Sequence, residues 1–146
     1  MSLRLGGIRV ARLRATGFDS DSVDEEEIVW KLTVIDKLLS TKKPARAMFG
    51  TLRAASEDGW AEIEVSGIVY GARNVDPEVL HRDVLKSEAA ETLFDFARSH
   101  LTPLLAQVGS SQSVPLKAPD PDFRFVEREE FEQLLAKGEE ADDADE

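Results

Sequence analysis

The sequence predicts an α+β fold in which a four-stranded antiparallel meander sheet packs with one long helix and a short C-terminal helix. Three observations support this class: one long segment with helical periodicity, four shorter segments with strand-like composition, and an Asp-Gly turn signal between two of them. The chain has 146 residues and no internal repeat. We therefore expect a single domain over residues 1–137, followed by a disordered acidic tail over residues 138–146.

The long helix is predicted from Ser87 to Val108. At 100° per residue, its apolar side chains fall on one half of the circumference and its polar side chains on the other. Ser87 is a candidate N-cap, and Gly109 follows where a left-handed C-cap belongs. Pro103 lies on the polar side, where it would bend the helix around a core; a break at Thr102 is the alternative. The apolar half carries Ala90, Leu93, Phe94, Phe96, Ala97, Leu101, Leu104, Leu105 and Val108.

The four predicted strands span residues 7–16, 28–34, 45–55 and 60–70. In the first, the alternation slips between Val10 and Ala11, which is typical of an edge strand with a bulge whose arginines face solvent. In the third, Met48 and Leu52 lie on one side and Phe49 on the other.

The fourth strand alternates cleanly and follows the best turn signal in the chain. Asp58-Gly59 predicts a tight hairpin with the third strand. Beyond the turn, Ala61, Ile63 and Val65 point to one side. Glu62 and Glu64 point to the other, so one face of the sheet is expected to meet the core and the other to carry acids.

The rest of the chain is expected to be helical or extended. Asp76 and Pro77 open a short helix as N-cap and first residue. Residues 110–123 contain three prolines and are predicted to be extended without a partner strand, and residues 127–137 form the last helix.

Composition excludes several classes of function. The chain has no cysteine, which rules out disulfides, zinc fingers, thiol nucleophiles and iron–sulfur centres. The net charge is −11, but the segment from Glu127 onward holds ten acids, and the remainder is near neutrality. This distribution argues against nucleic acid as a partner. No apolar run approaches 18 residues, so we expect a cytoplasmic protein without membrane insertion.

No catalytic set is apparent, so neither an enzyme nor a cofactor or metal is expected. His100 lies on the apolar side of the long helix, where a histidine that hydrogen-bonds backbone is the common case. His81 has no nucleophile or acid at a suggestive spacing. Glu62 and Glu64 could join Asp19 in one acidic surface, which is either a solvated sheet face or a docking patch for a basic partner.

Two motifs resemble the SecB family of protein-export chaperones. Leu93 to Arg98, LFDFAR, is similar to that family's Leu-Phe-Pro-Tyr-Ala-Arg. Pro115 to Phe123, PLKAPDPDF, is similar to its Pro-x-Leu-x-Leu-x-Pro-Val-Asn-Phe, and Ala61 to Ile68 resembles its fourth strand. Asp95 and Phe96 depart from the family's proline and tyrosine. Such departures bear on clients and partners, because a divergent branch of the family serves antitoxins rather than export.

The resemblance implies a dimer of dimers that holds unfolded chains in apolar grooves without ATP. It also implies an acidic patch that docks the translocation ATPase, with Asp19 and Glu64 at matching positions, Glu62 beside them, and Ala15 in place of a further acid. The candidate residues for core and groove are the aromatic side chains Trp30, Phe49, Phe94, Phe96 and Phe123.

Four functions thus remain open at the level of sequence, one of them a purely structural or phage-type oligomer and the other three as follows. The first is a holdase for unfolded or preprotein chains, most simply in protein export. The second is a SecB-like chaperone dedicated to an antitoxin. The third is a small-molecule-binding or enzymatic domain in which a curled sheet surrounds the helix; this would require convergent ionisable groups on the concave face, where Ala61, Ile63 and Val65 offer none.

Overall fold

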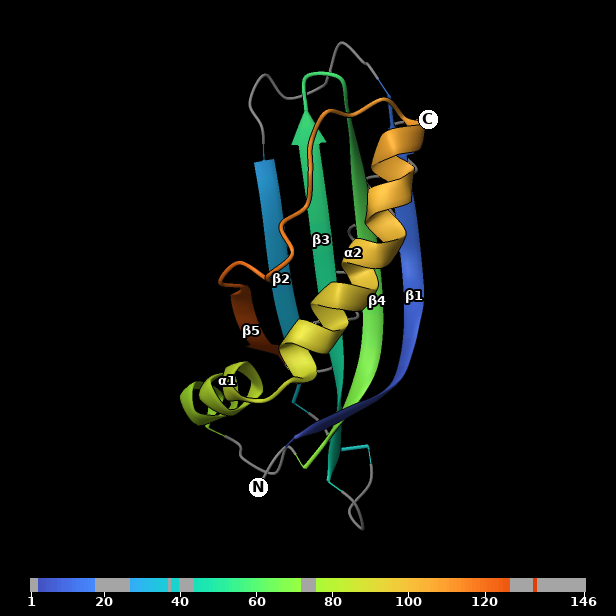
Figure 1. Ribbon diagram of the computed structural model, residues 1–146. Helices are drawn as coiled ribbons and strands as arrows, with labels where there is room; N and C mark the ends of the chain where they lie inside the picture. The colour runs from blue at the N-terminus through green and yellow to red at the C-terminus, as the bar shows by residue number, and fades with distance from the viewer. Residues whose placement is uncertain are drawn as a thin grey trace.

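The computed structural model describes residues 3–17, 27–36, 38–39, 44–71, 76–126 and 133. Figure 1 shows a sheet with the long helix α2 lying obliquely across one of its faces. The short helix α1 lies beside the N-terminal end of α2. The elements are β1 (Arg4–Thr16), β2 (Glu27–Ile35), β3 (Ala45–Ser56), β4 (Gly59–Tyr70), α1 (Pro77–Lys86), α2 (Ala89–Gln107) and β5 (Asp122–Val126).

The α+β class is confirmed, with a largely antiparallel sheet of strand order β1-β4-β3-β2-β5. The meander order is right for β2, β3 and β4 and wrong for β1, which pairs with β4 so that Thr16 lies opposite Trp60. Alternation indicates which side chains share a face, but it does not indicate which strand lies next. Ten residues connect β1 to β2, and a connection of that length does not force its two strands to be neighbours.

The fifth strand lies where the sequence predicts an extended segment without a partner. β5 runs parallel to β2, with Lys31 opposite Asp122 and Ile35 opposite Val126. It is five residues long and follows three prolines, which is too short a stretch for periodicity to reveal. The predicted helix over 127–137 and the tail over 138–146 lie outside the described residues, apart from Gln133.

The predicted hairpin and edge strand are both confirmed. β3 and β4 meet at the Asp58-Gly59 turn, where Ser56 lies opposite Gly59. A Cβ on Gly59 would lie 2.8 Å from the carbonyl oxygen of Thr16, so the close approach of β1 requires glycine there. β1 lies at one edge of the sheet and has irregular register between Gly6 and Arg9 and again beyond Val10, as expected of a bulged strand.

The predicted caps are occupied, and one of them serves two helices. Asp76 caps α1 as expected, because its carboxylate accepts a hydrogen bond from the Glu78 amide at 3.0 Å. Ser87, expected to cap the long helix, lies between the two helices and serves both: its hydroxyl donates to the Val84 carbonyl at 2.8 Å at the end of α1 and accepts from the Ala89 amide at 3.3 Å at the start of α2. Only two residues separate the helices, and the orphan carbonyls at the end of α1 compete for that hydroxyl. α2 continues through Pro103 without a break and ends before Gly109, whose φ is 76°.

The core lies between α2 and the sheet. Trp30 of β2 meets Phe94 of α2 edge to face, with ring centroids 5.3 Å apart. Gly50 makes room for that indole, because a Cβ on Gly50 would lie 2.5 Å from the Trp30 ring. The other fully buried side chains include Leu32, Val34, Met48, Leu52, Ile63, Val65, Leu93 and Leu101.

Candidate functional site

The face of the sheet opposite α2, called here the open face, carries the side chains that alternate with the core residues. Its central rows follow from the strand register: Arg12 lies opposite Glu64, and Arg14 opposite Glu62. On β3, Arg53 also lies opposite Glu62, and on β2, Lys31 lies opposite Thr51. Residues far apart in the sequence thus meet in cross-strand rows that carry charges of both signs.

Glu62 is held between two arginines. One of its carboxylate oxygens accepts a hydrogen bond from Arg14, and the other accepts from Arg53 at 3.5 Å. Arg53 also lies over the Trp60 ring, 4.5 Å from its centroid. The acids of β4 therefore share the open face with arginines. Sequence reasoning missed this mixture because it placed β1, the source of Arg12 and Arg14, away from β4.

The structure describes two of the three residues of the predicted acidic patch. Glu62 and Glu64 do lie on one face, two residues apart on β4, as their alternation predicts. Asp19, the third member of the predicted patch, lies outside the described residues.

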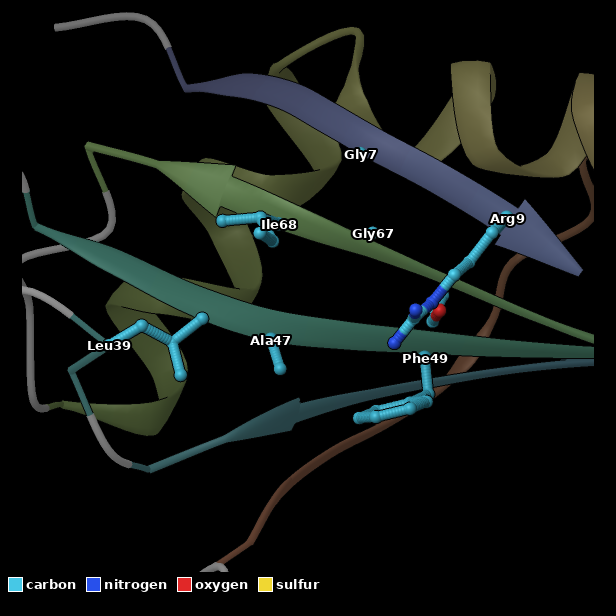
Figure 2. Close-up of a pocket in the computed structure, with 8 residues that line it drawn as sticks. Gly7, Arg9, Leu39, Ala47, Phe49, Gly67 and Ile68 are labelled. Carbon is cyan, nitrogen blue, oxygen red and sulfur yellow. The ribbon is translucent and has the colours of Figure 1, made fainter. Parts of the chain in front are cut away.

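A depression of about 380 Å³ lies on the open face, towards the end of the sheet where β1 bulges. Figure 2 shows Ile68 of β4 and Leu39 beyond β2 near one end of it, and Arg9 reaching from β1 across β4 towards Phe49. Gly7 has φ 60° and contributes no side chain, so the depression is not filled at this position. The described residues that line it are Gly7, Arg9, Leu39, Ala47, Phe49, Ser66, Gly67 and Ile68.

The chemistry of this depression is that of an apolar contact site. Leu39 is 52% exposed, and Phe49 and Ile68 are half-buried, so their hydrocarbon surface is accessible. Among the described residues of the lining, Arg9 is the one ionisable side chain. An apolar side chain from another polypeptide would find complementary walls here, with one positive charge beside them.

The structure places the five predicted aromatic residues in four different surroundings. Trp30 and Phe94 are buried in the core. Phe49 lines the depression on the open face. Phe96 is half-buried on α2 and its ring tilts against His100, with centroids 4.5 Å apart, whereas Phe123 on β5 stacks on His81 of α1 at 4.4 Å. Three of the five thus remain partly accessible, and they do not lie together.

The contacts of the two histidines are local: His100 bonds its own helix backbone, and His81 stacks on Phe123. His100 is exposed, and its Nδ1 hydrogen-bonds the Phe96 carbonyl at 2.9 Å, so the expected backbone partner is present. In the described part of the chain, no three His, Cys, Asp or Glu side chains come together as a metal site would require. The described helices include none that is long and apolar enough to cross a membrane.

Residues 110–121 cross the α2 side of the sheet on their way to β5 (orange in Figure 1). The segment is tied down at both ends: the Ser110 and Ser56 hydroxyls lie 2.8 Å apart, and the Ala118 amide donates to Glu91 at 3.4 Å. Val114 packs against the core, whereas Leu116 is 78% exposed. The segment therefore belongs to the packed layer of α2 and presents a single large apolar side chain to solvent.

No family model and no curated protein matches the sequence. Among solved structures, the chain is similar to the Mycobacterium tuberculosis SecB-like chaperone Rv1957, solved in complex with a ChAD peptide from the HigA1 antitoxin Rv1956. The two share 13% sequence identity over 82% of this chain and 87% of that chain, with a TM-score of 0.50. The chain therefore has a distant SecB-like fold, as the two sequence motifs indicate, and at this identity the likeness concerns the fold alone.

Proposed function

We propose that this protein is an ATP-independent molecular chaperone, a holdase that binds unfolded polypeptide segments through apolar contacts. The observation that carries the proposal is the depression around Phe49, which presents accessible apolar walls on the sheet face opposite α2. A holdase requires such a surface and no catalytic set. The SecB-like fold supports the same function.

The size of the depression sets what it can hold. A cavity of about 150 Å³ is enough to bind benzene, so about 380 Å³ suits one or two client side chains. Each buried apolar side chain contributes about 1.5–3 kcal/mol, whereas micromolar binding needs about 8 kcal/mol. One depression is therefore insufficient for tight binding, and we propose that Phe96 and Phe123 supply further contacts.

Several copies of the chain would supply the remaining affinity by multivalent binding. We propose a homo-oligomer, a dimer of dimers. The edge strand β1 supports this arrangement, because its side chains Val10 and Leu13 are 38% and 46% exposed. Light scattering after gel filtration is expected to give the mass of four chains, and a monomer would contradict the oligomer.

Two client classes fit this function. The antitoxin peptide bound to the structural neighbour favours a dedicated antitoxin client. The other class is preproteins for export. In that case a translocation ATPase would dock at Asp19, Glu62 and Glu64. That docking is the less favoured proposal, because a basic partner would have to displace Arg14 and Arg53 from Glu62. A cytoplasmic location fits both classes and is equally a proposal.

An enzymatic or small-molecule-binding role is less favoured by the lining of the depression. Pocket enzymes present convergent ionisable groups. Here Arg9 is the one such group among the eight lining residues that the structure describes. The open face therefore offers apolar contact more readily than chemistry.

The experiment is aggregation suppression by the full chain without nucleotide. A permanently unfolded polypeptide is mixed with the protein at micromolar concentration, and light scattering is followed. We expect stoichiometric suppression, weakened by Phe49→Ser and unchanged by the matched control Leu116→Ser, which alters an exposed leucine outside the depression. Thermal melting of each variant separates loss of binding from loss of folding. Absence of suppression by the unmodified chain would contradict the proposal.

A further inference from the structure

The last strand leaves the sheet beside the depression. β5 runs parallel to β2 (Figure 1) and ends at Val126, which lies opposite Ile35. Val34 packs in the core, so alternation places Ile35, and Val126 with it, on the open face. The Asp36 amide donates to the Val126 carbonyl at 2.6 Å, and Leu39, a little further along the chain, lines the depression. The chain thus passes beyond Val126 at the end of the open face that holds the depression.

The distance from this exit to the depression is short. The register of β2 with β3 places Ile35 level with Ala47, which lines the depression. Neighbouring strands are about 4.8 Å apart, so Val126 lies two strands, or about 10 Å, from Ala47. A helix over residues 127–137 would be about 16 Å long at about 1.5 Å per residue. That length is sufficient to cross the depression.

The sequence of residues 127–137 carries one apolar stripe. Phe131, Leu134 and Leu135 are the large apolar side chains beyond Val126, and their spacing of i, i+3 and i+4 places them on one side of a helix. Gln133, which the structure describes, is helical and exposed. At 100° per residue it falls on the side opposite the stripe. A helix here would therefore have one apolar side to bury.

The depression offers the matching apolar surface. Leu39 is 52% exposed, and Phe49 and Ile68 are half-buried in its walls. Burying these side chains against the stripe is favourable because it removes apolar surface from water on both sides. A segment of the same chain is also present at an effective concentration of about 1 mM, without the entropy cost of bringing two molecules together. A cover built from a few side chains is still weak enough for a client to displace.

We propose that residues 127–137 form a helical cover that occupies the depression when no client is bound. Phe131, Leu134 and Leu135 pack against the walls around Phe49. A client must displace this cover, so the chain's own C-terminal segment limits client binding. The inference rests on the proposed function and adds the regulation of the same site.

The first test is disulfide trapping, because the chain has no cysteine of its own. Ala47→Cys combined with Leu134→Cys should form a disulfide within one chain under mild oxidation. The matched control combines Leu134→Cys with Leu116→Cys, an exposed position on the α2 side; it should oxidise about tenfold more slowly, since bonded cysteines need Cα atoms closer than about 7 Å. Equal rates in the two pairs, or mass spectra that show bonds mainly between two chains, would overturn the proposal.

The second test measures client affinity. Phe131→Ser, Leu134→Ser and Leu135→Ser together remove the stripe from the full chain and leave the lining of the depression unchanged. A cover that is closed about nine-tenths of the time weakens apparent binding about tenfold, so this apolar triple variant should bind a fluorescent unfolded peptide about tenfold more tightly than the unmodified chain. Anisotropy titration measures the difference, and thermal melting checks that the variant folds.

The matched control alters three polar residues on the opposite side of the same predicted helix. Glu129→Ser, Gln133→Ser and Lys137→Ser together leave the net charge unchanged and should leave the affinity unchanged. The proposal is overturned if the apolar triple variant binds no more tightly than the unmodified chain, or if the control gains as much. Peptide binding by the unmodified chain would then leave the proposed function standing, whereas absence of binding by all three proteins would remove the function itself.

Discussion

The two faces of the sheet come from the same strands but are packed in different ways. On the α2 face, Trp30, Phe94 and Gly50 fit together so closely that a Cβ added to Gly50 would lie 2.5 Å from the Trp30 ring. On the open face, Phe49 lies next to Gly50 in the sequence yet borders a depression. Because side chains alternate along a strand, one sequence encodes a fixed core on one face and an accessible apolar surface on the other.

The largest expected effect is on the α2 face. Phe94→Ala removes a fully buried ring that packs on Trp30 and should lower the free energy of unfolding by about 3–5 kcal/mol. Denaturant titration followed by circular dichroism measures it. A loss below about 1 kcal/mol would mean that α2 is not seated on the sheet as described.

A smaller loss of unfolding free energy is expected when a methyl group is added at Gly50 on the same face. Gly50→Ala places a Cβ 2.5 Å from the Trp30 ring and should cost about 1–3 kcal/mol through overpacking. Trp30→Phe replaces the indole with a smaller ring and makes room for the added Cβ. The double variant should therefore lose less free energy of unfolding than the sum of the losses in the two single variants. Simple additivity in that double-mutant cycle would contradict the contact.

On the open face, Phe49→Ala is expected to separate binding from stability. The ring is half-buried, so its removal should cost only about 1 kcal/mol of folding free energy. It should weaken client binding about tenfold, because one apolar contact is lost. Peptide titration and denaturant unfolding of the same variant provide both numbers. A large stability loss with unchanged binding would reverse the roles given to the two faces.

The smallest effect is expected for the charge rows. Glu62→Gln leaves Arg14 and Arg53 without their carboxylate, but both arginines are about one-third exposed, so the cost should be below about 1 kcal/mol. The difference should fade in 1 M salt, where screening is strong. Asp95→Asn on the exposed side of α2 serves as control. A loss that persists in high salt would indicate packing rather than charge.

The sequence predicted the features of the fold that depend on residues close together in the chain. The alternation of β4, the Asp58-Gly59 turn and the apolar side of α2 are local patterns, and the structure confirms them. The alternation in β3 already set Phe49 on the side opposite Met48. It could not tell that this side is hollowed, because the hollow arises where a bulge in β1 meets β4.

Long-range pairing is what the sequence could not supply. Arg14 and Glu62 are 48 residues apart, and their contact follows from the place of β1 beside β4. β5 joins the sheet through five residues that pair with β2 from the far end of the chain. The mixture of charges on the open face was therefore missed, although the segments that form β1 to β4 were each predicted as strands.

The most direct measurement is a map of where an unfolded client touches the isotope-labelled full chain, by amide chemical shifts. We expect shifts at Ala47, Phe49 and Ile68 around the depression and at Phe96 and Phe123, where further contacts are proposed, with Leu101 and Leu105 in the C-terminal half of α2 unchanged. Shifts confined to α2 and the segment 110–121, with the open face silent, would contradict the claim that clients bind at the depression.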